Sequence, residues 1–405
     1  MRFIRTASTG RLLATIVGLA IAIAAGTAIA VAASGPGPVP GPQRLASAAH
    51  KALAAPPVTG ITADISFTNH LIDSSDFAGG KVDPILQGAT GRLWLSNDHR
   101  MRLELQSDNG DAQVVVNQRS FWVSDPSSHT VYQGTLPADK PGARSKPASD
   151  HGVPTVSQLQ RDLTKLRRHV NVSGATPSDV AGQAAYTVSV SPKHDGGLLG
   201  QAQLAWDAIR GVPLRIAVYA KNNNTPVLEL KATNISYGTV AASTFNVTPP
   251  AGSKIVKVST AGKGMKAPKM AKHGARAHHE LSGVAAVARR LPFKLVAPSK
   301  LVGLPRKNVQ LLDWGGEPAT IVSYGQNLGG IAVLEQAARS GKANASADGG
   351  NGRGLSLPTV SINGATGQEL DTALGTVVRF TRGGVAYTVI GSVPSTAADA
   401  AARGL

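Results

Sequence analysis

Apolar and polar residues alternate along the segment 90–133, and the alternation breaks every few residues at residues that form turns. Large apolar side chains take every second position on both sides of the first turn: Leu93, Leu95, Met101, Leu103 and Leu105. Asn, Asp, Ser and Gly residues at 97–99 and 107–110 mark the turns. A period of two interrupted by such residues is typical of an antiparallel meander that buries one face.

The same period of two recurs before and after this segment and predicts further strands. We expect them at 60–69, 183–191, 204–207, 213–220 and 227–236. Together with the meander they would make one large antiparallel sheet. The first part of the chain is therefore predicted to be mostly sheet, with few helices.

Two segments show the spacing of a helix instead. Residues 44–55 carry Leu45 and Leu53 on one face and end before Pro56. Residues 155–169 have Thr155 or Ser157 as the N-terminal cap. The second helix places four apolar side chains on one face: Val156, Leu159, Leu163 and Leu166.

The C-terminal part, 281–392, is predicted to be a separate, small α+β domain. A short helix is expected at 281–289, and 338–358 is a loop rich in Gly, Asn and Ser. Strands are expected at 294–296, 309–312, 320–324, 331–335, 360–362, 376–381 and 385–390. The tail 393–405 is rich in Ala and is either a terminal helix or a frayed end.

The N-terminal region carries a pattern of membrane insertion. Residues 1–11 contain three Arg residues, and an uncharged run of 22 residues follows at 12–33. That run is long enough to cross a bilayer, and the Arg residues predict a cytoplasmic N-terminus. A cleaved signal peptide is the alternative, because Ala28-Ile29-Ala30 fits signal peptidase. Both readings put the remainder outside the cytoplasm, after the Pro/Gly spacer 34–43.

The net charge and its distribution indicate which classes of partner the protein could bind. The net charge is +17, with a sequence pI of about 10.3, and much of the excess lies in the linker 259–280. Five of its basic residues are candidates for contact with an anionic lipid or cell-wall surface: Lys263, Lys266, Lys269, Lys272 and Arg276. A solvated linker is the simpler interpretation. Nucleic acid is not expected, because the basic tract has no aromatic residues and the compartment is extracytoplasmic.

The sequence offers no recognisable catalytic or cofactor chemistry. The chain has no Cys, which excludes disulfides, thiolate metal sites and a lipid-modified N-terminal Cys. His278-His279-Glu280 lacks the second His of a zinc-binding helix and lies in the linker. Nucleophile-elbow and phosphate-loop motifs are absent from the sequence. We therefore predict no catalytic residue, no metal, no cofactor and no enzymatic activity.

Three phrases in the first domain resemble the LolA-like lipoprotein-carrier superfamily. They are the G-x-L-W-L phrase of 91–95, the G-x-P-L-R phrase of 211–215 and the F-x-x-x-P-P-x-G phrase of 245–252. The resemblance covers about 44–258. It implies a curved antiparallel sheet, an unclosed half-barrel, with helices on its concave side. Residues 290–392 show a weaker likeness to small α+β domains of bacterial extracytoplasmic regulators.

One position departs from the carriers of this superfamily. An Arg-Pro pair usually follows their L-W phrase, and its Arg helps to hold helices over the cavity. The matching positions here are Asn97 and Asp98. A switchable lid of that type is therefore not expected in this chain.

The resemblance implies binding of an apolar ligand on the concave face. The candidate cleft residues are Leu93, Leu95, Leu103, Leu105 and Val115. The expected ligand is a lipid or lipoprotein. The alternative is a sensor or regulator that binds another membrane protein, such as an anti-sigma factor or sensor kinase. Arg100, Arg102 and Glu104 alternate with the cleft residues and are expected on the wet convex face.

Overall fold

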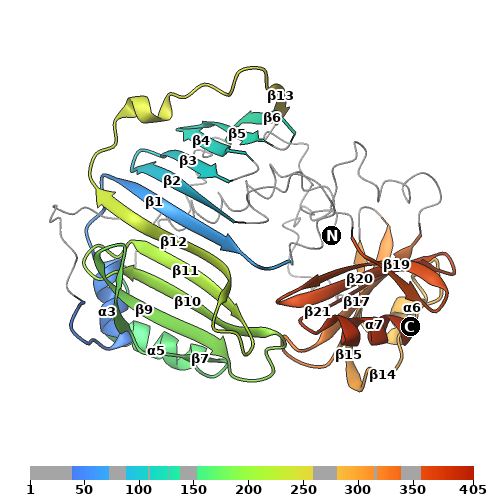
Figure 1. Cartoon of the computed structure of the whole chain (residues 1–405). Helices are drawn as coiled ribbons and strands as arrows, with labels where there is room; N and C mark the ends of the chain where they lie inside the picture. The colour runs from blue at the N-terminus through green and yellow to red at the C-terminus, as the bar shows by residue number, and fades with distance from the viewer. Residues whose placement is uncertain are drawn as a thin grey trace, which may run out of the picture.

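The computed structural model describes residues 39–72, 88–107, 110–126, 128–136, 153–258, 281–313, 317–338 and 357–405. Within these ranges the chain forms two separate sheets, one of 13 strands and one of 8 strands, with a few short helices (Figure 1). The α+β fold class is confirmed.

The first sheet contains the meander and the strands predicted around it. Its strands are β1 (Gly60–Asn69), β2 (Gly88–Ser96), β3 (Arg100–Gln106), β4 (Ala112–Asn117), β5 (Ser120–Asp125), β6 (Thr130–Thr135), β7 (Val170–Val172), β8 (Thr176–Val180), β9 (Gln183–Pro192), β10 (Leu199–Asp207), β11 (Pro213–Ala220), β12 (Pro226–Tyr237) and β13 (Lys254–Val258). The spatial order is β13-β6-β5-β4-β3-β2-β1-β12-β11-β10-β9-β7, and β8 pairs with β9. All of these pairs are antiparallel except β13 with β6, which is parallel.

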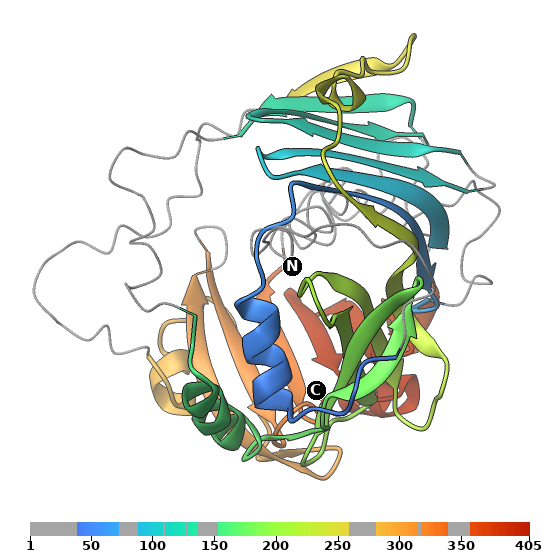
Figure 2. The ribbon, with the colours of Figure 1, turned by 90° about the vertical axis from the view of Figure 1, so that its left-hand side faces the viewer.

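Strand β1 joins the two halves of this sheet. Ile61 lies opposite Leu95 of β2 on one side and opposite Tyr237 of β12 on the other. The whole sheet curves into an open half-barrel (Figure 2). Alternate residues of its central strands point into the concave side, where Ile61, Ile65 and their neighbours form the main apolar core.

Two helices pack on the concave side of the first sheet, over strands β9 and β10. Helix α3 (Leu45–Leu53) buries Leu45 and Ala48 against Tyr186 and Trp206 of β9 and β10. Helix α5 (Val156–Leu166) contacts α3 and brings Leu163 to the same cluster. Figure 2 shows α3 inside the curve of the sheet. The expected arrangement, a curved antiparallel sheet with helices on its concave side, is confirmed.

A covering segment crosses the convex side between β12 and β13. Its 3-10 helix η2 (Ala242–Phe245) buries Phe245. The guanidinium of Arg102 donates to the carbonyl of Thr244 over 3.1 Å, and the indole of Trp122 donates to the carbonyl of Val247 over 3.1 Å. Arg100 and Arg102 lie on the convex face as expected, but that face is less wet there than expected, because the covering segment leaves their side chains only 18% and 21% exposed.

The second sheet lies in the C-terminal part. Its strands are β14 (Lys300–Leu301), β15 (Leu304–Asp313), β16 (Pro318–Tyr324), β17 (Ile331–Ala337), β18 (Thr359–Ile362), β19 (Ala365–Thr372), β20 (Gly375–Arg382) and β21 (Val385–Gly391). Helix α6 (Val284–Ala288) precedes them and helix α7 (Ser395–Arg403) follows them. The tail is therefore a helix, and it is packed rather than frayed, because Ala398, Ala401 and Ala402 are buried.

One predicted strand of the second unit is wrong. Residues 294–296 are not a strand in the structure. Leu295 and Val296 instead pack on the core of the second sheet, and the amide of Val296 donates to the carboxylate of Glu335 over 3.0 Å. Two strands that the sequence did not predict, β14 and β19, are present.

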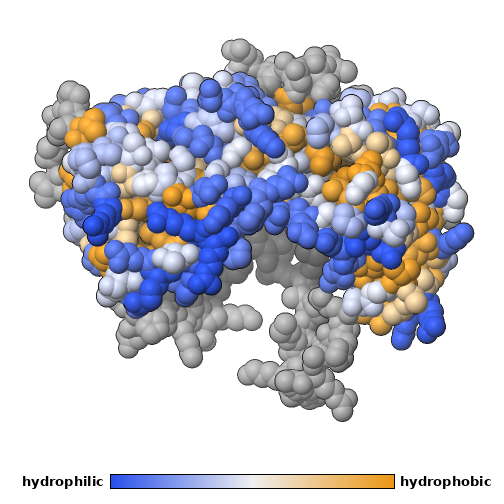
Figure 3. All heavy atoms as spheres, turned by 90° about the horizontal axis from the view of Figure 1, so that it is seen from below, coloured by the Kyte–Doolittle hydropathy of each residue, from blue (hydrophilic) through white to orange (hydrophobic). Residues whose placement is uncertain are grey.

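The two sheets touch through a few close backbone contacts. The amide of Leu198 donates to the carbonyl of Ser392 over 3.1 Å, and that of Ala373 donates to the carbonyl of Leu71 over 2.9 Å. A Cβ added at Gly197 would meet the carbonyl oxygen of Ser392 at 2.1 Å. We call these contacts the joint between the two sheets. Seen from below, hydrophilic side chains dominate the first unit and apolar side chains gather on the second (Figure 3).

Several sequence predictions fall on residues outside the described ranges. They include the apolar run 12–33 and the basic linker 259–280. Among the helices that the structure describes, none has the length and apolar character needed to cross a membrane.

Candidate functional site

An apolar cavity opens on the concave face at the middle of the first sheet. Its volume is about 100 Å³. Strands β1, β2, β11 and β12 and the turn before β11 contribute its walls: Ile61, Ala63, Ile65, Leu93, Leu95, Val212, Pro213, Leu214, Arg215, Ile216, Leu230, Lys231, Ala232 and Ile235. An apolar cavity of ~150 Å³ is large enough for benzene. The space here is about two thirds of that volume, which is the size of the end of an alkyl chain and not of a whole one.

Two charged residues at the cavity wall turn their charged groups to the other face of the sheet. Arg215 lies between Leu214 and Ile216, and Lys231 lies between Leu230 and Ala232. Because neighbouring residues of a strand point to opposite faces, the apolar neighbours face the cavity. The charged groups of Arg215 and Lys231 bind Glu229 on the opposite face instead.

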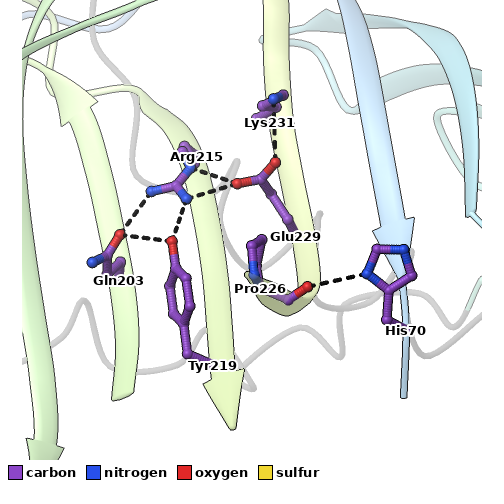
Figure 4. Close-up of polar contacts among 7 residues, drawn as sticks. All are labelled: His70, Gln203, Arg215, Tyr219, Pro226, Glu229 and Lys231. Carbon is purple, nitrogen blue, oxygen red and sulfur yellow. Dashed lines mark hydrogen bonds and ion pairs between the residues drawn. The ribbon is translucent and has the colours of Figure 1, made fainter. Parts of the chain in front are cut away.

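A network on the convex face holds these charged groups in place (Figure 4). Arg215 Nε donates to Glu229 Oε1 over 2.7 Å, and a terminal nitrogen donates to the hydroxyl of Tyr219 over 2.6 Å. The other terminal nitrogen donates to Gln203 over 2.8 Å, and the ammonium of Lys231 lies 3.3 Å from Glu229 Oε2. The carboxylate of Glu229 is buried and binds both Arg215 and Lys231. The network therefore holds strands β10, β11 and β12 together beside the cavity.

A buried ion pair fixes the turn that leads into β11. Asp207 is 1% exposed and accepts from the amides of Ile209 and Arg210 at 2.8 Å each. Its other oxygen accepts from the Arg210 guanidinium at 3.2 Å and from the Tyr237 hydroxyl at 2.9 Å. Burial raises the pKa of Tyr237, and the charge of Asp207 adds to the rise. The turn and Val212 at the cavity wall are thus rigidly held.

The structure brings together only part of the predicted cleft. Leu93 and Leu95 line the cavity. Leu103 and Leu105 share the concave face but lie in the packed core, 6% and 4% exposed. Val115 lies on the opposite face, against Trp122 and Val131. Its assignment to the concave face was wrong, because Val114 and Val116 take the inward positions of β4.

The predicted surface-contact residues all lie outside the described residues: Lys263, Lys266, Lys269, Lys272 and Arg276.

Asp98 takes one of the two positions that were compared with the Arg-Pro pair of the carriers. Its carboxylate binds Arg100. The hydrogen bond from Arg100 lowers the pKa of Asp98 to about 2. Asp98 Oδ1 accepts from Arg100 Nε over 2.9 Å, so this pair serves the turn between β2 and β3.

Sequence reasoning missed the cavity residues of β1, β11 and β12. Their alternation was visible and predicted a buried face for each strand. What it could not show is that β1 lies between β2 and β12, which brings Ile65 beside Ala232. The signal available was the shared apolar period of the segments 60–69, 213–220 and 227–236.

The described residues hold no group of three or more His, Asp or Glu side chains that is placed to bind a metal ion. The buried carboxylate of Glu335 lies in the second sheet, far along the chain from the cavity walls. The walls of the cavity in the first sheet are apolar and suit an apolar group.

The fold and cavity define a class of protein: a half-barrel with an apolar concave face and an appended α+β unit. No family model matches the sequence, and no curated protein matches it. Solved structures do match. The complex of MucA and MucB from Pseudomonas aeruginosa is 15% identical, with a TM-score of 0.37, covering 89% of this chain and 94% of that chain.

Two further matches cover about half of this chain. A conserved protein from Thermus thermophilus is 10% identical over 53% of this chain and 97% of that chain, with a TM-score of 0.31. A LolA superfamily protein from Nitrosomonas europaea is 7% identical over 51% and 98%, with a TM-score of 0.20. The last bears the name of the superfamily that the sequence phrases resemble. At these TM-scores only this chain's own geometry supports a function.

Proposed function

We propose that this chain is a non-catalytic binding protein that holds the alkyl chain of a lipid or lipid-modified protein on its concave face. The observation that carries the proposal is the cavity: its walls are apolar, and both charged residues at its wall direct their charges to the convex face. Each CH₂ group removed from water would contribute about 0.8 kcal/mol. The polar head of such a ligand would remain at the mouth.

We also propose that the protein acts outside the cytoplasm and is anchored by residues 12–33. The support is the sequence pattern alone, with Arg residues before an uncharged run of 22 residues. Lipids and lipid-modified proteins are present at the outer surface of the membrane. The proposed ligand and the proposed location therefore agree.

The test is native mass spectrometry on the chain from residue 34 onward, purified without detergent from a host that supplies lipid. We expect an added mass that extracts into organic solvent. Leu95→Arg, which places a charge in the cavity wall, should remove that mass. Ile209→Arg is the matched control, because Ile209 is 59% exposed in the turn before β11.

Two results would contradict the proposal. One is a folded Leu95→Arg protein that keeps the extractable mass. The other is a wild-type protein that is folded and carries no added mass. The second result would favour the regulator alternative and direct the search to a protein partner by cross-linking.

A further inference from the structure

Strand β13 is the last strand at one end of the first sheet, as far as the structure describes it. Among the described strands it pairs with β6 alone, and it stands at the end of the spatial order (Figures 1 and 2). It follows the covering segment of the convex face and lies six strands away from the central strand β1 in that order. It is thus separate from the cavity.

The register shows which backbone groups face outward. The amide of Lys254 donates to the carbonyl of His129 over 2.9 Å, so Lys254 directs its backbone groups toward β6. Successive residues of a strand alternate in this direction. Val256 and Val258 therefore also face β6, and Ile255 and Lys257 present their N–H and C=O groups at the free edge.

The side chains of this edge are apolar and basic. Ile255 and Val258 are 54% and 37% exposed, and Lys254 and Lys257 are exposed as well. Strands β6 and β13 contain no acidic residue. Lys residues on an edge strand repel edges of like charge. With a net charge of +17, a second copy of this chain is a poor partner, whereas an acidic strand is a good one.

We propose that the free edge of β13 binds an extended, acidic segment of another protein, which adds to the sheet as a further strand. Backbone groups of Ile255 and Lys257 pair with the added strand. Lys254 and Lys257 select acidic side chains beside it, and Ile255 supplies apolar contact. This site is independent of the ligand cavity.

The test uses the full chain and two short fluorescent peptides, one of alternating Glu and Val and one of alternating Lys and Val. We expect saturable binding of the Glu peptide, measured by anisotropy, and none of the Lys peptide. Hydrogen exchange should show that the Glu peptide protects the amides of Ile255 and Lys257. Binding that is equal for the two peptides, or absent for both, overturns the proposal.

Variants separate backbone pairing from charge. Ile255→Pro removes the outward donor while leaving the bonds to β6, and it should weaken binding about tenfold. Lys257→Glu should weaken it about fivefold. Lys221→Glu, an exposed residue in the turn between β11 and β12, makes the same change in net charge and should leave binding intact.

The variants also distinguish a loss of the β13 site from misfolding and from an effect of the cavity on peptide binding. If Ile255→Pro lowers the melting temperature, Lys257→Glu alone carries the test. Equal affinities for Lys257→Glu and Lys221→Glu overturn the proposal. Leu95→Arg should bind the Glu peptide normally, and a loss of binding there would contradict the independence of the two sites.

Discussion

At the scale of single residues, Glu335 is the least expected group in the protein. It is fully buried in the second sheet, and Oε2 accepts from the Val296 amide while Oε1 has no hydrogen-bond partner among the described residues. Burial raises its pKa to about 7. Burial raises the pKa of two tyrosines of the same sheet, Tyr324 and Tyr387, and the charge of Glu335 adds to each rise. The carboxyl group is therefore best accommodated when it carries a proton.

This burial makes the stability of the second sheet depend on pH. The folded pKa of about 7 lies above the ordinary pKa of 4.5, which describes the carboxyl group in the unfolded chain. Between these values the folded chain holds a proton that the unfolded chain releases, so stability is full below pH 4.5 and is lost as pH rises through 7. The loss is on the order of 3 kcal/mol, since each pKa unit corresponds to about 1.4 kcal/mol.

Glu335→Gln should remove this dependence. The amide has a similar shape, and its oxygen can still accept from Val296. We expect the free energy of opening of β16 and β17, measured by hydrogen exchange, to exceed that of wild type by about 3 kcal/mol at pH 8 and to match it near pH 4.5. A wild-type opening energy that is constant from pH 4.5 to 8 would contradict the assignment.

At the scale of elements, helix α5 depends on its ends. All of its residues are described and none is buried, so the packing of Leu163 on the cluster beside α3 stabilises the helix less than full burial would. Its N-terminus carries a reciprocal cap: Thr155 Oγ1 accepts from the Gln158 amide over 3.2 Å, and the Gln158 side chain accepts from the Thr155 amide over 2.7 Å. The sequence predicted Thr155 as one of two candidate caps, and this choice is confirmed.

Thr155→Ala should destabilise α5 locally by about 1 kcal/mol, because it removes one half of the cap. Hydrogen exchange of the amides of 156–166 measures the effect. Thr164→Ala is the control, because Thr164 lies inside the same helix and its hydroxyl donates to the Gln160 carbonyl, not to the N-terminal cap. Equal protection in the two variants would show that the cap contributes nothing.

Local patterns predicted most strands of both sheets, because alternation and turn residues are local properties. Local patterns failed in two cases. In one, successive residues are all apolar, so the pattern does not show which of them face the core. In the other, the paired strands are far apart in the sequence. Three successive Val residues at 114–116 fit either face, and the position of Val115 was assigned wrongly as a result. The parallel pairing of β13 with β6 joins residues far apart in the sequence, and alternation alone cannot show it.

The residues 294–296 illustrate a different limit. They are apolar enough for a strand, yet they cover a core rather than join a ladder, and the amide of Val296 is satisfied by a side chain. The apolar side chains of such a segment predict correctly that it is buried. They do not show whether its backbone pairs with another strand or with a side chain. The cavity was missed for a similar reason, since four strands from distant segments build it.

At the scale of the whole molecule, the joint fixes how the two sheets sit together. Gly197 has φ +60° and lies against the backbone of Ser392. Gly197→Ala should therefore open the joint and increase the radius of gyration, measured by small-angle X-ray scattering, while both sheets stay folded. Gly182→Ala is the control: φ is +71°, and no heavy atom lies within 4 Å of an added Cβ.

The two variants share the strain of an L residue at positive φ, so only the clash at the joint distinguishes them. Equal scattering profiles would show that the Gly197 contact does not hold the sheets together. A larger radius for Gly182→Ala alone would contradict the role of the joint as well.

The central place of β1 has a consequence for how the protein is made. Its partner β2 follows soon in the chain, but its other partner β12 comes only after β2 to β11 have been synthesised. Until then one edge of β1 has no paired strand, and the two halves of the sheet are not joined. Long-range pairing of this kind slows folding and leaves an unpaired edge exposed to aggregation. The nascent chain is thus at its most vulnerable between the synthesis of β1 and that of β12, a period in which a chaperone would have most effect.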